Sequence, residues 1–325
     1  MENKRIGRLV GLDALRLVAA FFVICQHLHN YWGIDVVRPI SRIAVFLFFL
    51  ISGYFLYDED IVQIRKKCYK SIHKLCRIYL FAILIYGIEA LCVSMTTDSY
   101  DLFHVGPWKW FVFITSCTSP FFPYGYHLWF LVALIEALVI ICIISVRYNI
   151  FTWKYIGILC VMLSMAGVAV NHYVISLPMQ KTLLLAMPTI VLGGVIRRRK
   201  IKMNILYALL LIILCSVASV WESNYWPNNY NFSTPILSVI LFIMFRDLPK
   251  CKSLTRIARI GANLSLGIYI IHPMIIDVLQ HVDWGKSQIT MNPVFILLAS
   301  YILVLLESGL EKNISIILNT KHKKS

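Results

Sequence analysis

The chain has 325 residues, of which 59% are hydrophobic and 14% are charged, and its mean hydropathy is +0.74. Soluble domains carry about 25% charged residues, and a globule of this size could not bury so much apolar surface. This composition excludes a soluble domain, a disordered chain and a small disulfide scaffold. Unbroken apolar runs such as AVFLFFLI at 44–51 lack the alternation of a transmembrane β-barrel. We therefore predict an all-α polytopic membrane protein.

The apolar segments predict about ten membrane-spanning helices in a single integral-membrane domain over residues 1–325. A spanning helix needs about 20 mostly apolar residues. Residues 108–118 are apolar but brief and lie between two prolines, so they are interpreted as an interfacial or re-entrant segment. The predicted spans are 9–30, 40–57, 75–96, 127–147, 151–171, 182–197, 204–221, 234–246, 263–281 and 293–316.

The distribution of positive charge predicts the orientation. The chain carries 31 Lys and Arg and a formal net charge of +15. With ten spans and the N-terminus inside, 25 of these side chains fall on the cytoplasmic side and five on the outer side. Such an asymmetry is typical of cytoplasmic loops, so both termini are predicted to be cytoplasmic. The same loops account for the net charge without a nucleic-acid partner.

The first predicted helix carries three polar side chains, Asp13, Arg16 and His27. Charged groups inside a span are costly and usually functional. Arg16 and His27 are eleven residues apart, about three turns, and so share one face at a separation of roughly 16 Å. Asp13 can pair with Arg16 at i, i+3. The alternative is that Asp13 and Arg16 merely neutralise each other while His27 caps the span. The shared face favours a functional pathway.

Four further polar or aromatic side chains in the spans are weaker candidates. His127 and Trp129 lie at the outer end of the fourth span, where they could contact an acceptor or anchor the helix at the interface. Glu136 follows on the same span. His272 precedes a proline in mid-helix and could shape a cavity, although packing alone would also explain it.

Five motifs, in order along nearly the whole chain, resemble those of the membrane-bound acyltransferase-3 family. They are Arg16 with His27, Ser52-Gly53-Tyr54, Arg77, His127-Leu128-Trp129 and the segment 264–273, LSLGIYIIHP. The chain also resembles the membrane domain of membrane-bound serine racemases. It departs from the family at Lys74, where a second arginine is frequent, and at Leu80, where a proline is frequent. It also lacks the extracytoplasmic esterase-like domain that some members carry.

The resemblance implies transfer of an acyl group, usually acetyl, from cytoplasmic acyl-CoA to a hydroxyl of a cell-surface or cell-wall polysaccharide or its lipid-linked precursor. It places the protein in the bacterial cytoplasmic membrane as a multi-pass protein. His27 would be the general base, although a covalent acyl-histidine intermediate stays open. The residues implied at the site are Asp13, orienting Arg16; Arg16, Arg77, Ser52 and Tyr54, binding acyl-CoA; and His127, Trp129, Glu136 and His272, contacting the acceptor.

Two alternatives accompany these assignments. Ser52-Gly53 could serve close helix packing instead of donor binding. A bundle with intramembrane Arg and His could also be a permease or exporter of amino acids or glycans, although no paired broken helices are visible in two related halves. No ligand cluster for a metal is apparent. The sequence does not determine the acceptor, the acyl group or the oligomeric state.

Overall fold

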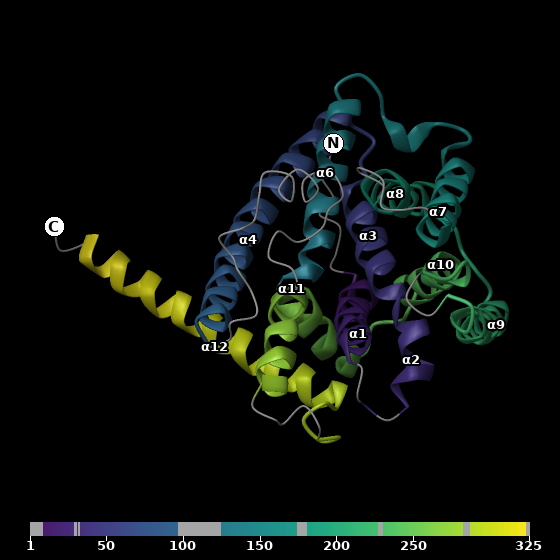
Figure 1. Cartoon of the computed structure of the whole chain (residues 1–325). Helices are drawn as coiled ribbons and strands as arrows, with labels where there is room; N and C mark the ends of the chain where they lie inside the picture. The colour runs from purple at the N-terminus through teal and green to yellow at the C-terminus, as the bar shows by residue number, and fades with distance from the viewer. Residues whose placement is uncertain are drawn as a thin grey trace. The chain divides into compact units, whose positions relative to one another are not determined.

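The computed structural model describes residues 9–28, 31, 33–96, 125–173, 181–226, 230–281 and 287–322, and every regular element in these ranges is a helix (Figure 1). The chain divides into two compact units. One comprises Met1–Ser41 with Pro249–Ser325, and the other comprises Arg42–Leu248. The first unit thus joins the two ends of the chain, and each unit is described by itself.

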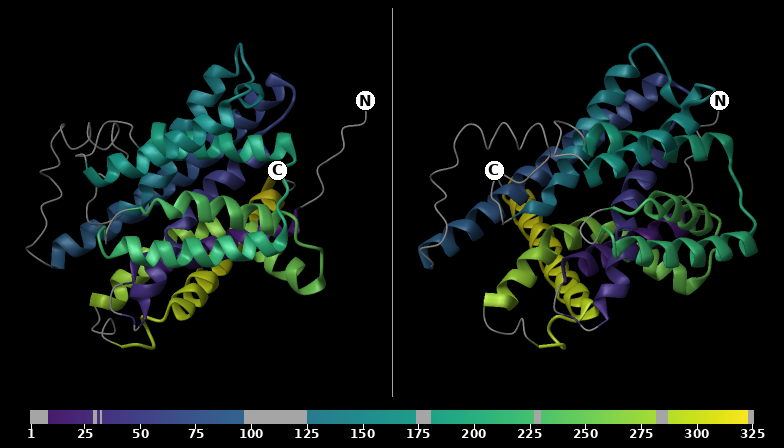
Figure 2. Two further views of the ribbon diagram at one scale, coloured as in Figure 1. Left: turned by 90° about the vertical axis from the view of Figure 1, so that its right-hand side faces the viewer. Right: turned by 45° about the vertical axis from the view of Figure 1, so that its right-hand side comes forward.

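The first unit is built around one helix pair. Its helices are α1 (Val10–His27), α2 (Ile34–Ser41), α11 (Lys252–His281) and α12 (Pro293–His322). Figures 1 and 2 show α1, in purple, lying along α11, and α11 also packs against α12. Apolar residues of α1 are fully buried, which is the pattern of an interior helix. They include Leu12, Leu15, Ala19, Ala20 and Ile24.

Helices α1 and α11 run parallel, as two contacts between them show: the contact that comes first along α1 also comes first along α11. A Cβ on Gly261 would overlap the carbonyl oxygen of Asp13, so only glycine permits this approach of the two backbones. Further along both helices, His27 meets His272. Two parallel neighbours that each cross a membrane require an odd number of crossings between them. The seven spans predicted between these two helices are consistent with that requirement.

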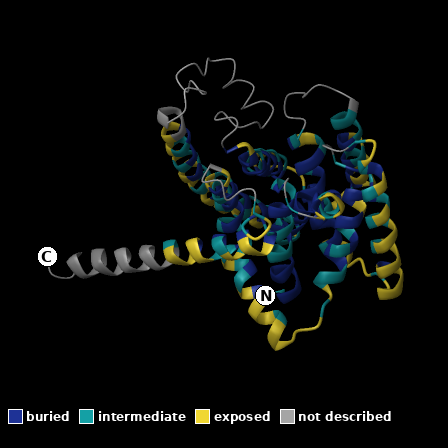
Figure 3. Ribbon diagram, turned by 60° about the horizontal axis from the view of Figure 1, so that its bottom comes forward, coloured by how far each residue is buried: buried dark blue, intermediate teal, exposed yellow. Residues whose placement is uncertain are grey.

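Helix α12 exposes much of its apolar surface. Val294, Leu298 and Ile302 are each more than half exposed. Figure 3 shows exposed residues, in yellow, along the part of this helix that leads to the C-terminus. Because the side chains are apolar and recur at helical spacing, this face suits a hydrocarbon environment better than water.

The second unit contains the remaining helices. Its interior includes fully buried Phe46, Phe49 and Phe242. The elements are α3 (Ile43–Leu56), α4 (Ile61–Thr96), η2 (Tyr126–Leu128), α6 (Trp129–Ile144), η3 (Ile150–Thr152), α7 (Ile156–Tyr173), the π-helix η4 (Lys181–Ala186), α8 (Met187–Arg199), α9 (Ile205–Ser223) and α10 (Ser233–Arg246).

Helices α3 and α8 approach each other through reciprocal glycines. A Cβ on Gly53 would overlap the backbone of Ile190, and a Cβ on Gly193 would overlap the backbone of Leu50. Small residues that let helix backbones touch are the usual device of packing in membranes. The Ser-Gly step of the second predicted span is therefore a packing feature of this structure.

The carboxyl end of α3 is closed by arginine. Arg197 donates hydrogen bonds to the carbonyl oxygens of Tyr54 and Tyr57, each at 3.0 Å, and its guanidinium lies 5.6 Å from both ring centroids. The neighbouring Arg198 donates to the carbonyl of Phe151 at 3.1 Å. Cations favour the negative carboxyl end of a helix and satisfy its free carbonyls. Arg197 and Arg198 therefore hold a helix end and a loop in place.

The helix boundaries agree in part with the predicted spans. In the part of the chain that the structure describes, five helices are long and apolar enough to cross a membrane: Val10–His27, Ile61–Cys92, Tyr126–Ile144, Ile205–Ser223 and Lys252–Gln280. The same part holds three shorter apolar helices, Ile156–His172, Ser233–Arg246 and Pro293–Glu307. An all-helical membrane protein is thus supported, while the count of ten spans and the cytoplasmic termini stay predictions.

Several predicted boundaries need correction. The third span, expected at 75–96, belongs to a 36-residue helix that starts at Ile61, because the basic stretch before it also favours helix. The second, expected at 40–57, is broken into α2 and α3 near Arg42. The sixth, expected at 182–197, begins as a π-helix. The segment 108–118 lies outside the described residues.

Candidate active site

The predicted site residues divide between the two units. Asp13, Arg16, His27 and His272 belong to the first. The second contains Ser52, Tyr54, Arg77, His127, Trp129 and Glu136. Within each unit the contacts of these side chains are defined, and they are described in turn.

An ion pair marks one end of α1. The Arg16 Nη1 atom lies 2.8 Å from the Asp13 Oδ1 atom, at the i, i+3 spacing that the sequence suggested. The Asp13 side chain is only 6% exposed, whereas 27% of the Arg16 side chain is accessible. The carboxylate is thus buried and compensated, while the Arg16 side chain is partly accessible. Guanidinium groups bind phosphate with two donors, which fits a contact with an anionic cofactor.

A histidine pair marks the other end of α1. The rings of His27 and His272 stack with centroids 5.2 Å apart and planes 29° apart. His272 is fully buried, and its Nδ1 lies 3.1 Å from the carbonyl oxygen of Ile268, one turn earlier in α11. Because a carbonyl only accepts, Nδ1 carries a proton and donates in this contact. His272 is thereby fixed in orientation, whereas His27 is half-buried and lies in the last turn of α1.

Pro273 lies directly after His272, inside α11. A proline cannot donate a backbone hydrogen bond, so the carbonyl one turn before it loses its usual partner. Helix α11 nevertheless continues through Pro273 to His281. The ring of His272 donates to a carbonyl in this same weakened turn. The proline removes the donor to the carbonyl of Tyr269, whereas the ring of His272 donates to the carbonyl of Ile268, the residue before it.

In the second unit, the amino-terminal part of α6 collects aromatic and charged groups. His127 is buried, and its ring meets the ring of Tyr86 edge-on, with centroids 5.0 Å apart. The Lys181 ammonium lies 4.7 Å from the centroid of the Trp129 ring. Cation–π contacts of this kind are worth about 0.5–2 kcal/mol. Both predicted residues are therefore engaged with neighbours that the sequence did not indicate.

Glu136 is held by the π-helix. The hydroxyl of Thr182 donates to its Oε2 atom at 2.5 Å. Short π-helical segments are rare and frequently lie at functional sites. The position of Glu136, roughly 13 Å further along α6 than His127, follows from the helical rise. Lys181 and Thr182 are functional candidates that sequence reasoning missed, because nothing in their spacing pointed toward α6.

The predicted acyl-CoA contacts of this unit have differing surroundings. The hydroxyl of Ser52 donates to the carbonyl of Phe48 at 2.8 Å, as serines within helices commonly do. Tyr54 lies against Arg197 and Phe242. Arg77 is exposed on α4. Their predicted role with the donor stays a prediction, and Arg197 joins Tyr54 as a cation that the sequence did not single out.

Comparison with known proteins identifies the family. Residues 9–308 match the acyltransferase domain of the acyltransferase-3 family. The chain belongs to the acyltransferase-3 family. This match includes every predicted site residue and parts of both compact units, so the chain carries an acyltransferase-3 domain. Among the described residues, no group of three or more His, Cys, Asp or Glu could hold a metal ion.

Two curated relatives of this acyltransferase-3 protein carry racemase names. The serine/alanine racemase of Enterococcus gallinarum is 24% identical over 306 residues, which is 84% of this chain and 41% of that protein. The amino-acid racemase of Enterococcus faecalis is 21% identical over 350 residues, which is 95% of this chain and 47% of that protein. The chain therefore spans less than half the length of these relatives. No solved structure matches the chain.

Proposed function

We propose that this protein transfers an acyl group, most simply acetyl, from cytoplasmic acyl-CoA to a hydroxyl of a surface glycan or its lipid-linked precursor. The observation that carries the proposal is the pairing of half-buried His27 with oriented, buried His272 in a chain of the acyltransferase-3 family. An imidazole that is supported by a neighbour of fixed orientation suits a general base.

The reaction assigns a separate role to each end of α1. Neutral His27 removes the proton of the acceptor hydroxyl while its oxygen attacks the thioester carbonyl. A carbon–oxygen bond forms, the carbon–sulfur bond breaks, and the leaving CoA thiolate recovers the proton from the imidazolium. Arg16, neutralised in part by Asp13, binds phosphate or pantetheine oxygens of the donor. The separation of roughly 16 Å between these groups leaves room for an extended pantetheine arm.

The second unit supplies the remaining proposed contacts. Arg77 and Tyr54 would contact the donor, with Ser52 beside them. His127, Trp129 and Glu136 would contact the acceptor, because aromatic and amphipathic side chains suit the faces and hydroxyls of sugar rings. These roles rest on the family resemblance together with the side-chain types, and each can be tested by substituting the residue on its own.

The test uses purified protein in nanodiscs and follows the release of free CoA thiol from acetyl-CoA. Wild type, His27→Gln and the control His73→Gln, an exposed histidine on α4, are each assayed with and without a crude membrane-glycan fraction. We expect glycan-dependent release by wild type and His73→Gln alone. Equal release by His27→Gln would remove His27 from the chemistry. An absence of release from every variant, with folding verified and many acceptors tried, would favour a permease.

A further inference from the structure

A pocket in the first unit lies at the end of α1 that carries His27. It has a volume of about 520 Å³ and is open to the surroundings. Tyr31, four residues after His27, forms one wall, and the start of α12 with the turn before it forms the other. The volume falls within the range of about 300–1,000 Å³ that is typical of small-molecule sites. The pocket is lined by Tyr31, Gln288, Ile289, Asn292, Val294, Phe295 and Leu298.

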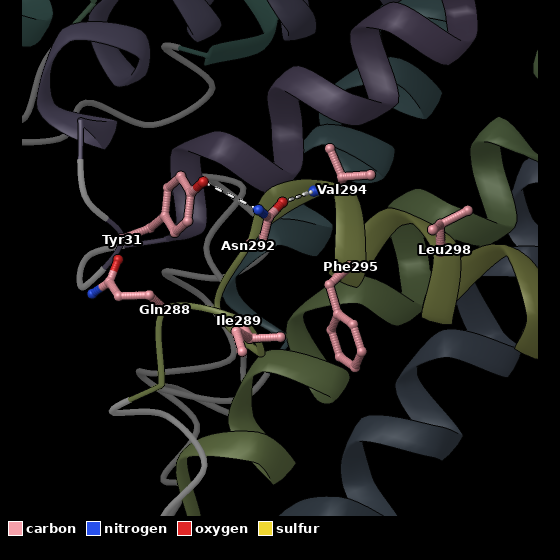
Figure 4. A pocket seen from close by; sticks show the side chains of 7 residues that line it. All are labelled: Tyr31, Gln288, Ile289, Asn292, Val294, Phe295 and Leu298. Carbon is pink, nitrogen blue, oxygen red and sulfur yellow. Dashed lines mark hydrogen bonds between the residues drawn. The ribbon is translucent and has the colours of Figure 1, made fainter.

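The two ends of this pocket differ in chemistry. Figure 4 shows Tyr31, Gln288 and Asn292 at one end and Phe295 and Leu298 toward the other. Among the described residues, no side chain that lines the pocket carries a charge. A cluster of phosphates would find no cation among these side chains, which disfavours the CoA head as the ligand. Neutral hydroxyl groups match phenol and amide side chains, which both donate and accept hydrogen bonds.

The polar end is held in place by hydrogen bonds. The Asn292 Nδ2 atom donates to the Tyr31 hydroxyl at 3.1 Å, and the Asn292 Oδ1 atom accepts from the backbone N–H of Val294 at 2.8 Å (Figure 4). Because the Tyr31 oxygen accepts from Asn292, its own proton points elsewhere and can be donated to a ligand. Ser287 stabilises the preceding turn by accepting from the backbone N–H of Ile289 at 3.2 Å. The donors are thus presented by a preformed wall.

The apolar end is exposed and continues along α12. Phe295 is 39% exposed, Leu298 is 54% exposed, and Ile302 one turn further is 54% exposed. In a membrane-spanning helix these side chains face hydrocarbon. Gly267 of α11 lies beside Val304 of α12, because a Cβ on this glycine would be 2.7 Å from Val304 Cγ1. Leu298 precedes Val304 by about as many residues as His272 follows Gly267. At about 1.5 Å per residue, Leu298 then lies at roughly the same height along the helix axis as His272.

We infer that this pocket binds the acceptor as an amphiphile, with a neutral hydroxylated head at Tyr31 and Asn292 and a hydrocarbon chain along Phe295, Leu298 and the exposed face of α12. The inference rests on the proposed function, which it deepens by naming a lipid-linked saccharide rather than a free glycan as the acceptor. The arrangement brings hydroxyls to the His27 end of α1, whereas the cation expected to hold the donor lies at the opposite end.

The experiment measures binding without acyl-CoA, so it is independent of catalysis. A dodecyl maltoside with a photoreactive diazirine on its alkyl chain is incubated with the protein in phosphatidylglycerol nanodiscs, irradiated, and its attachment sites are mapped by mass spectrometry. We expect labelling at Phe295, Leu298 or Ile289. Excess unlabelled dodecyl maltoside should reduce it at least fivefold, whereas equal concentrations of maltose or dodecylphosphocholine should leave it unchanged.

Two variants test the polar end. Tyr31→Phe removes the hydroxyl and keeps the ring, and Gln288→Leu removes the amide and keeps the bulk; each should lower the labelling several-fold. Leu206→Ala, at an exposed leucine of α9 that does not line the pocket, should leave it unchanged. Equal competition by dodecylphosphocholine would reduce the pocket to a general lipid surface and overturn the inference. Competition by maltose alone would overturn the lipid-linked acceptor in favour of a free glycan.

The outcome is separable from that of the proposed function. Specific labelling without any CoA release would retain the pocket and remove the acyl transfer. CoA release that depends on His27, with labelling that Tyr31→Phe and Gln288→Leu do not change, would retain the acyl transfer and overturn the pocket.

Discussion

His27 and His272 stack at a centroid distance of 5.2 Å, although 245 positions separate them in the sequence. The contact forms because α1 and α11 run parallel, with Gly261 allowing the backbones to touch at the Asp13 end. One ring is oriented by a backbone carbonyl and the other lies in the last turn of its helix. The proposed catalytic base and the residue proposed to position it thus come from opposite ends of the chain.

The first prediction concerns His272 as a positioning residue. His272→Phe keeps the stacked ring but loses both nitrogens, while His272→Asn keeps a donor near the carbonyl of Ile268. We expect His272→Phe to lower kcat on the order of 10²-fold, with an unchanged KM for acyl-CoA, because a misplaced base affects the transition state alone. His272→Asn should recover part of the loss. Steady-state kinetics in nanodiscs provide the measurement.

The pH profile distinguishes positioning from mere packing. If His272 acts through His27, then the acid limb of kcat/KM should move in His272→Phe, because the base has lost a polar neighbour. A variant that only destabilises the helix pair would scale the rate at every pH and leave the limb in place. That second result would contradict the prediction.

The second prediction concerns Arg16. Arg16→Lys retains the charge beside Asp13 but loses the planar pair of donors, so the KM for acyl-CoA should rise by about tenfold, equivalent to about 1.4 kcal/mol of binding free energy. Arg38→Lys is a matched control. Arg38 pairs with Asp35 at the same i, i+3 spacing, and its side chain is likewise 27% exposed. Equal changes in both variants would show that the donor does not contact Arg16.

The third prediction concerns the glycine contact between α3 and α8. Gly53→Val places a side chain against the backbone of Ile190, which cannot move aside as a flexible side chain could. Overpacking of this kind costs about 1–3 kcal/mol, so the thermal transition in nanodiscs should fall clearly. The control is Gly157→Ala, whose Cβ would lie at an ordinary 3.5 Å from Val195 Cγ1. A Gly53→Val protein as stable as wild type would contradict the packing described.

The fourth prediction concerns pH and the pair formed by Asp58 and Lys67, whose charged atoms are 3.0 Å apart. Burial alone would raise the pKa of Asp58, but the hydrogen bond and charge of Lys67, together with the backbone N–H groups of Asp60 and Glu59, outweigh it and hold this pKa below its usual 3.8. The stabilisation is therefore complete above the unfolded pKa and lost as pH falls through the lower folded value. Because each side chain is one-third exposed, it is worth at most about 1 kcal/mol.

The measurement compares the thermal stability of wild type and Asp58→Asn between pH 7 and pH 3. The advantage of wild type should be constant near neutrality and should shrink below about pH 4. The exposed neighbour Glu59 supplies the control Glu59→Gln. An advantage of wild type over Asp58→Asn that persists unchanged to pH 3 would contradict the assignment.

The sequence by itself determined the helical class, the family and the residues of α1. A long apolar run that crosses a membrane forms a helix, because a helix satisfies its backbone hydrogen bonds internally. The pairing of Asp13 with Arg16 joins residues three positions apart, so helical periodicity was enough to predict it. Motifs at fixed spacing likewise pointed to the family before any contact was known. The start of α4 and the π-helix η4 were less predictable, because neither a helix of polar residues nor a π-helix shows the apolar repeat of about 3.6 residues by which an α-helix is recognised in a sequence.

Only the tertiary structure decided which distant side chains meet. The stack of His27 on His272, the hydrogen bond between Tyr31 and Asn292, and the contact of Thr182 with Glu136 join positions far apart in the chain. Such contacts depend on the order and register in which helices pack, and that register is set by close approaches such as Gly261 on Asp13. Helical periodicity determines which face of its helix a side chain occupies, but the tertiary packing determines which other helix lies against that face.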